Sequence, residues 1–303
     1  MSLVGDPSLR RMPSLPAEPR PGDAKALAEA LQQHHRVFTL TGAGCSTASG
    51  IPDYRDREGK WKRQQPVLFR AFMGDPLMRA RYWARSLVGW RSFGTASPNP
   101  AHHALTALER SGRLGLLVTQ NVDGLHQAAG SRRVIDLHGR LDRVICMSCR
   151  QGSRRAAWQR LLEDRNARWI GVDAPVAPDG DADLEGVNFS SFDVPGCPAC
   201  GGIVKPDVVF FGEGVPVWRH TQATAALASS DAMLVAGSSL MVYSGYRYAA
   251  TAARLGKPLY AVNLGRTRAD HLLTMKVSAA VGATLDDVVT RLALSSQRAA
   301  SAR

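Results

Sequence analysis

The sequence lacks any apolar run long enough to cross a membrane, and its first twenty residues lack the apolar core of a signal peptide. It therefore gives no support to a membrane-spanning or secreted protein. Cysteine is also scarce, with five among 303 residues, and four of them form two close pairs. Paired cysteines that serve as metal ligands fit a reducing compartment, so we expect a cytoplasmic protein.

Acidic residues are in the minority: 26 Asp and Glu stand against 38 Lys and Arg, which gives a net charge of +12. This balance favours acidic partners, such as nucleotide phosphates, nucleic acid or an acidic protein. The basic residues are spread along the chain, so the charge is the only support for a nucleic-acid-binding protein. We keep nucleic-acid binding as an alternative hypothesis that belongs to a different functional class from an enzyme.

The paired cysteines form two Cys-x-x-Cys motifs, Cys146 with Cys149 and Cys197 with Cys200. Four thiolates at one point suit a tetrahedral zinc ion, and a closed set of four leaves no open position for chemistry. About 47 residues separate the motifs, more than the roughly 15–20 of a compact ribbon, so a lobe must lie between them. The alternative is two disulfides or unrelated thiols. The fifth cysteine, Cys45, is expected to be a small buried side chain.

Short apolar segments alternate with helical patterns along the rest of the chain, which predicts a doubly wound parallel sheet. The expected strands are residues 37–41, 114–119, 134–137, 204–211, 232–236 and 257–262. The strands are followed by small or polar clusters, read as GAG, QNVD, HG, GSS and NLG. Because ligands bind at the carboxyl ends of strands in such sheets, these clusters predict a binding cleft.

The fold class is therefore α/β, a Rossmann-like sheet domain with a small inserted zinc-binding lobe. We expect a disordered tail over residues 1–22, which are rich in Pro, Arg and Ser. The sheet domain would comprise residues 23–140 and 203–295, and the zinc lobe residues 141–202. Residues 296–303 would form a C-terminal tail.

Two clusters point to chemistry. Gly42-Ala43-Gly44 follows a strand, as in phosphate-binding turns, but the next glycine is displaced to Gly50. The usual dehydrogenase fingerprint is thus incomplete, and a tight βα turn is the alternative. His138 stands at a strand end beside Gly139, which would leave room for a ligand, and a histidine titrating near 6.5 suits a general base.

The longer motifs resemble those of the sirtuin family of NAD-dependent protein deacylases. They are GAGCSTASGIPDYR (42–55), TQNVDGLH (119–126), LHG (137–139), the two cysteine pairs, KPDVVFFGE (205–213), GSSL (237–240) and NLG (263–265). The resemblance covers residues 23–290, with the motifs in order. Four further segments resemble the class II branch: RYWARSLVGW (81–90), PNPAH (98–102), AGSRR (129–133) and VYSGYR (242–247).

The resemblance implies roles for individual residues, with His138 as the catalytic base and one structural zinc on Cys146, Cys149, Cys197 and Cys200. NAD would be bound by strand-end and loop residues, namely Gly42, Ala43, Gly44, Asp53, Tyr54, Arg55, Trp61, Gln120, Asn121, Val122, Asp123, Gly237, Ser238, Ser239, Asn263, Leu264, Gly265 and Val281. The acyl-lysine substrate would pair with the segment that holds Val208, Phe210, Phe211, Gly212 and Glu213.

Within this set, the glycine turn would hold the diphosphate and Tyr54 would cover the nicotinamide ribose. Asn121 would bind the ribose, and Asp123 with Val122 would recognise the nicotinamide carboxamide. The expected reaction transfers an acyl group from lysine to ADP-ribose and releases nicotinamide. Mono-ADP-ribosylation of protein, or lipoamidase activity, at the same NAD site is the alternative.

The expected partners are NAD and acylated-lysine proteins, with no membrane and no specific nucleic acid. Tyr82 and Arg85 resemble the Tyr/Arg pair with which another sirtuin class binds acidic acyl groups. We interpret the two residues as helix surface instead, which predicts no dominant preference for succinyl groups.

Overall fold

The computed structural model describes residues 18–62, 66–174, 180–184 and 186–301. A seven-stranded sheet forms the larger part, and every pair of neighbouring strands in it is parallel. In spatial order the strands are β1 (Arg20–Pro21), β10 (Met275–Val277), β9 (Leu259–Val262), β8 (Ala232–Ala236), β2 (Val37–Thr41), β3 (Leu114–Thr119) and β4 (Val134–Asp136).

The chain order reverses at β2, which lies between β3 on one side and β8 on the other. All five residues of β2 and all five of β8 are buried, as expected for strands covered on both faces. In a doubly wound sheet the loops diverge at such a switch point, so a crevice opens at the carboxyl ends of these two strands.

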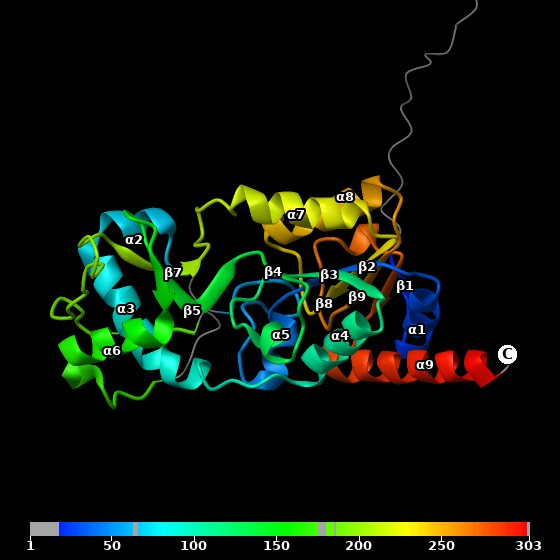
Figure 1. Cartoon of the computed structure of the whole chain (residues 1–303), viewed down its shortest axis with the longest axis horizontal. Helices are drawn as coiled ribbons and strands as arrows, with labels where there is room; N and C mark the ends of the chain where they lie inside the picture. Colours follow the sequence, from blue (N-terminus) through cyan, green and yellow to red (C-terminus); the bar gives the residue numbers. More distant parts are fainter. Residues whose placement is uncertain (1–17, 63–65, 175–179, 185, 302–303) are drawn as a thin grey trace, which may run out of the picture.

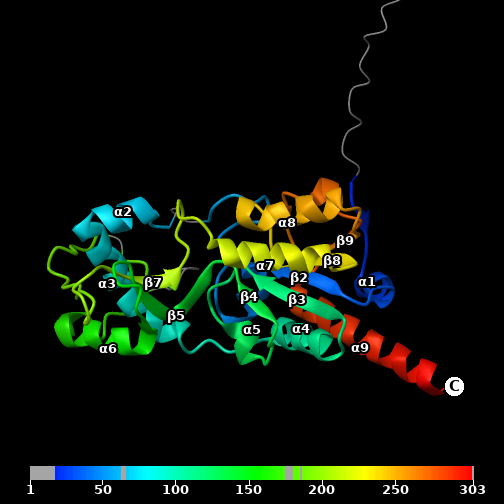
Figure 2. The same cartoon turned by 45° about the horizontal axis from the view of Figure 1, so that its top comes forward.

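Helices cover both faces of the sheet (Figures 1 and 2). One face packs against α7 (Val217–Ala228) and α8 (Tyr243–Arg254). The other packs against α1 (Ala24–Gln32), α4 (Pro100–Arg110) and α9 (Val281–Ser301). Local sequence fixes the start of two of them: Asp23 caps α1, and Asn99 forms a capping box in front of α4 with proline at its first position.

The smaller part contains a three-stranded antiparallel sheet of β6 (Gly152–Arg154), β5 (Gly139–Cys146) and β7 (Val204–Val208). It shares one apolar core with α2 (Phe69–Gly74), α3 (Pro76–Phe93) and α6 (Arg155–Arg165), on the left of Figure 1. The remaining short elements are α5 (Leu125–Ala128) and the 3-10 turns η1 (Ala43–Cys45), η2 (Thr47–Ser49), η3 (Ala167–Trp169) and η4 (Asp270–Leu272).

The parallel sheet with covering helices confirms the predicted fold class, while several boundaries differ. The segment expected as strand 204–211 ends at Val208 and lies in the small sheet. Arg20–Pro21 pairs with β10, although a disordered tail was expected up to residue 22. The helix α9 continues to Ser301, through most of the expected C-terminal tail. Residues 1–17 of the expected N-terminal tail lie outside the described part, and the domain division stays a prediction.

In the described residues, no helix is both long and apolar enough to span a membrane.

Candidate active site

A cavity of about 730 Å³ opens where the strand-end clusters meet, and His138 lies in its wall. Twenty-two of the expected site residues line it: Ala43, Gly44, Asp53, Tyr54, Arg55, Trp61, Gln120, Asn121, Val122, His138, Val208, Phe210, Phe211, Gly212, Glu213, Gly237, Ser238, Ser239, Asn263, Leu264, Gly265 and Val281. Gly42 and Asp123 do not line the cavity, but hydrogen bonds connect both of them to Asn121, which does. The sheet topology thus gathers the predicted cluster in one place.

The glycines after β2 and β8 allow the two strand ends to approach each other. The N–H of Gly44 donates to the carbonyl oxygen of Gly237 at 2.8 Å. A Cβ on Gly44 would lie 2.9 Å from the Gly237 Cα, and a Cβ on Gly237 would lie 2.4 Å from the Cys45 nitrogen. Side chains at these positions would therefore separate the turns that form the floor of the cavity.

The loop after the glycine turn lines one side of the cavity. The guanidinium of Arg55 lies 4.0 Å from the ring centroid of Trp61 and donates to the carbonyl oxygen of Gly59 at 2.7 Å. Trp61 meets Phe211 edge to face, with ring centroids 5.6 Å apart. Lys62 forms an ion pair with Asp53. Tyr54 also packs against Trp61, so this side of the cavity is aromatic.

A series of hydrogen bonds connects Asn121, which lines the cavity, with Asp123, which does not. The Nδ2 of Asn121 donates to the carbonyl oxygen of Gly42 at 3.1 Å and to Ser46 Oγ at 3.0 Å. The Ser46 hydroxyl in turn donates to Asp123 Oδ2 at 2.7 Å, and Asp123 Oδ1 accepts from the N–H of Leu125 at 2.9 Å. In this structure Asp123 is therefore connected to the cavity through two hydrogen bonds, one from Ser46 to Asp123 and one from Asn121 to Ser46. Ser46 carries this connection, which sequence analysis did not identify.

His138 follows β4 and leads directly into β5, so it stands at the junction of the two sheets. Its Nδ1 lies 3.0 Å from the carbonyl oxygen of Gln120, and its Nε2 lies 2.8 Å from Ser244 Oγ. A carbonyl oxygen only accepts hydrogen bonds, so Nδ1 carries the proton in the neutral ring and Nε2 holds the free electron pair. This is the tautomer that a general base at Nε2 needs.

Burial lowers the pKa of His138 to about 4, and the nearby Arg219 adds to the lowering. The expected titration near 6.5 is therefore wrong for the folded protein, because the surrounding chain removes water from the ring. The imidazole is neutral and able to accept a proton at any pH well above 4.

Gly139 has a different role from the one expected. Its φ is +84°, and a Cβ there would lie 2.0 Å from the carbonyl oxygen of Asp207 on β7. The missing side chain makes room for the neighbouring strand and not for a ligand.

The expected substrate-binding segment runs along the cavity beyond β7. The N–H of Val209 donates to the carbonyl oxygen of His138 at 2.7 Å, and the N–H of Phe210 donates to Glu213 Oε2 at 2.9 Å. The carbonyl oxygen of Phe211 accepts from the N–H of Phe69 at 2.9 Å. Part of the backbone is thus already paired within the chain, and pairing with a substrate strand stays a prediction.

Tyr82 and Arg85 do not form an exposed helix surface, which corrects our interpretation. Tyr82 is only 5% exposed and lines the cavity, where its ring contacts Phe210 with centroids 5.3 Å apart. Arg85 is half-buried and does not line the cavity, and its Nε donates to the carbonyl oxygen of Ala182 at 2.8 Å. The helix α3 is buried on several sides because it packs against the small sheet and also borders the cavity.

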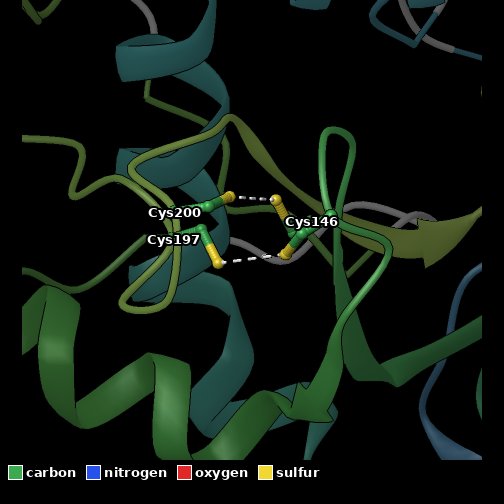
Figure 3. Close-up of side chains that lie close together, drawn as sticks. Cys146, Cys197 and Cys200 are labelled. Atoms are coloured by element: carbon green, nitrogen blue, oxygen red, sulfur yellow. Dashed lines mark hydrogen bonds between the residues drawn. The ribbon is translucent and has the colours of Figure 1, made fainter.

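The four paired cysteines come together in the smaller part of the molecule, where two loops face each other (Figure 3). The sulfur atoms all lie within 4.8 Å of one another, with Cys146 and Cys200 at 3.5 Å and Cys149 and Cys197 at 3.8 Å. Zn–S bonds of about 2.3 Å in a tetrahedron place sulfur atoms about 3.8 Å apart. All four are free thiols, so the cluster fits one zinc ion and not two disulfides.

Cys45 lies elsewhere, at 1% exposure in the turn after β2, which agrees with the small buried side chain that was expected. Burial raises its pKa to about 12, so it is an unreactive thiol.

Comparison with known proteins shows which family this chain resembles. The model of the Sir2 family matches residues 42–244. A protein of Bordetella bronchiseptica named NAD-dependent protein deacetylase is 61% identical over 271 residues, which cover 89% of this chain and 99% of the relative. A protein of the same name from Xanthomonas campestris pv. campestris is 63% identical over 252 residues, covering 83% and 86% of the two chains.

Solved structures show the same likeness. A Sir2 homolog in complex with NAD superposes with a TM-score of 0.70 at 30% identity, covering 92% of this chain and 97% of the other. A complex of Sir2 with a p53 peptide and NAD+ gives a TM-score of 0.69 at 30% identity, covering 90% and 100%.

Proposed function

The chain belongs to the Sir2 family, and from this premise we propose that it is an NAD-dependent protein-lysine deacylase. It transfers the acyl group of a modified lysine to ADP-ribose and releases nicotinamide. The observation that carries the proposal is the position of His138 in the cavity wall, with Nδ1 held by Gln120 and Nε2 able to accept a proton. The class II assignment stays a prediction from the sequence.

The residues around the cavity fit NAD. The glycine turn and the serines after β8 offer small backbone and hydroxyl groups for phosphates and ribose, and Asn121 lines the same cavity. Tyr54 and Trp61 offer aromatic surface in the cavity for a planar ring. When bound, NAD supplies an electrophilic ribose carbon from which nicotinamide leaves.

The chain itself supplies orientation and proton transfer. His138 accepts a proton at Nε2 from a hydroxyl group presented in the cavity, while Gln120 stabilises the proton on Nδ1. Part of the cavity is lined by large apolar side chains, namely Val67, Tyr82, Leu141 and Phe210. This surface suits the aliphatic stem of an acyl-lysine and keeps water from the reacting groups.

The zinc site stabilises the small sheet, from which β7 leads into the substrate-binding segment. Because four free thiolates must stay reduced to bind zinc, we place the enzyme in the cytoplasm. We expect acylated proteins as its partners, and no specific nucleic acid.

Nicotinamide release tests the proposal. Purified protein is incubated with NAD, with and without an acetyl-lysine peptide, and nicotinamide and deacetylated peptide are quantified together. We expect release that depends on the peptide and equals the amount of lysine formed. A His138→Ala variant provides the matched control for the base.

Three results would each favour an alternative to the proposed function. Labelling of protein by ADP-ribose without any acyl-peptide would favour mono-ADP-ribosylation, and release only with lipoyl-peptide would favour lipoamidase activity. No release under any condition would favour a binding protein with a sirtuin fold.

A further inference from the structure

Ser244 lies in the segment VYSGYR (242–247) and contacts the base, but it is not one of the residues expected to bind NAD or substrate. It lies in the first turn of α8, and its Oγ is 2.8 Å from Nε2 of His138. Because Nδ1 carries the ring proton, Nε2 can only accept, so the Ser244 hydroxyl is the donor. The nitrogen that must take up a proton is thus hydrogen-bonded to a residue more than one hundred positions further along the chain.

The first turn of α8 lies against the side chain of Gln120, the residue whose carbonyl oxygen accepts from the other ring nitrogen. Gly245 faces the Gln120 side chain, and a Cβ on Gly245 would lie 2.6 Å from Gln120 Nε2. Gln120 Oε1 accepts from the Ser238 hydroxyl at 2.6 Å. Gln120 therefore fixes His138 through its carbonyl group, and its side chain lies against the turn that carries Ser244.

We propose that Ser244 is the positioning residue of the base: its hydroxyl orients the His138 imidazole so that Nε2 faces the cavity. A hydroxyl suits this task because it both donates and accepts. In the resting site it donates to the single lone pair of Nε2. When a cavity hydroxyl transfers its proton to Nε2, the Ser244 O–H first rotates away from that lone pair, and Ser244 Oγ then accepts from the Nε2–H that has formed. Ser244 and Ser238 both line the cavity, so this contact lies beside the groups assigned to the cofactor.

The ring would be less restrained without Ser244. Nδ1 would still bind Gln120, but one hydrogen bond leaves rotation about that contact free. A misplaced base reduces the rate of the proton transfer without affecting residues that hold the cofactor. Loss of one hydrogen bond at the reacting group corresponds to a roughly tenfold fall in kcat. The Michaelis constant for NAD should stay within about twofold of the wild-type value.

The inference rests on the proposed function, but its structural part is tested without NAD. The ring nitrogens of ¹⁵N-histidine-labelled protein are observed by NMR at pH 7.5 in wild type, Ser244→Ala and Ser244→Thr. We expect the Nε2 resonance of His138, identified by its absence in His138→Ala, to shift in Ser244→Ala and to return in Ser244→Thr. Ser230→Ala is the control, because that buried hydroxyl bonds Ala226 at the end of α7.

Kinetics complete the test. The expected result is a tenfold lower kcat in Ser244→Ala with an unchanged Michaelis constant for NAD, and recovery in Ser244→Thr. An unshifted Nε2 resonance, or a kcat equal to wild type in Ser244→Ala, would overturn the inference. Wild-type protein without deacylase activity would instead refute the proposed function, while the NMR result would still decide whether the contact exists.

Discussion

Acid should destabilise this protein through two buried histidines that contact each other, His102 on α4 and His126 on α5. His126 is 1% exposed and its Nε2 lies 2.9 Å from Thr41 Oγ1, while His102 is fully buried and its Nδ1 accepts from the N–H of Asn99. The two ring centroids are 4.8 Å apart. Burial lowers the pKa of His126 to about 3 and that of His102 to about 4, so both are neutral in the folded protein.

The size of the effect follows from linkage. In the unfolded chain a histidine titrates near about 6.5, so below that pH the unfolded state binds protons that the folded state does not. Stability is therefore complete above pH 6.5 and falls as the pH approaches the folded-state pKa. Each pH unit below 6.5 costs about 1.4 kcal/mol per histidine. Between pH 7.5 and 5.5, His102 and His126 together should lower the free energy of unfolding by about 3 kcal/mol.

Urea unfolding at pH 7.5 and 5.5 measures this loss, with zinc content checked at both values. In His126→Gln the amide can replace the contact with Thr41 but takes up no proton on unfolding. The variant should lose about 1.4 kcal/mol less than wild type over this interval. Contributions from zinc and from His138 cancel in the comparison. Equal losses in the two proteins would refute the reasoning, and His102→Asn, whose oxygen can accept from Asn99, provides an independent repeat.

Three further predictions concern the zinc, the cofactor and the acyl group. Cys146→Ala should purify without its single equivalent of zinc and with an unfolded small sheet; stoichiometric zinc by elemental analysis would contradict the site. Asp123→Asn should weaken nicotinamide release and inhibition by nicotinamide at an unchanged thermal midpoint, because the amide is uncharged and keeps only one of the two oxygens that accept from Ser46 and Leu125; normal kinetics would refute this. Arg85→Met should leave the ratio of desuccinylation to deacetylation unchanged, whereas a selective fall in desuccinylation would identify Arg85 as a carboxylate-binding residue.

Much of the fold could be predicted from short segments of the sequence. β2 and β3 follow the predicted ranges 37–41 and 114–119, since buried parallel strands are continuous apolar runs. The gathering of strand-end clusters follows from topology alone. β7 was placed in the wrong sheet because an apolar run looks the same whether it pairs in parallel or antiparallel. β1 has only two residues, too few for any periodicity.

The site was less predictable where it depends on contacts between distant segments. The burial of Tyr82 arises because α3 lies between the small sheet and the cavity, which its own sequence does not encode. The lowered pKa of His138 and the closeness of Gly139 to Asp207 both require the neighbouring chain in place. Ser46 and Ser244 lie within the motifs 42–55 and 242–247, but the motifs assign them no role, and only their partners in space do so.

Substitution of His138 tests the central claim most directly. Deacylation by wild type, His138→Ala and His138→Tyr is measured on acetyl, succinyl, glutaryl, lipoyl and branched acyl peptides, and NAD binding is measured by calorimetry. A general base contributes about 10²–10⁴-fold, so both variants should lose activity by that factor on every peptide while NAD still binds. Near-normal deacylation by His138→Tyr on these peptides would contradict both the assignment of the base and the proposed reaction.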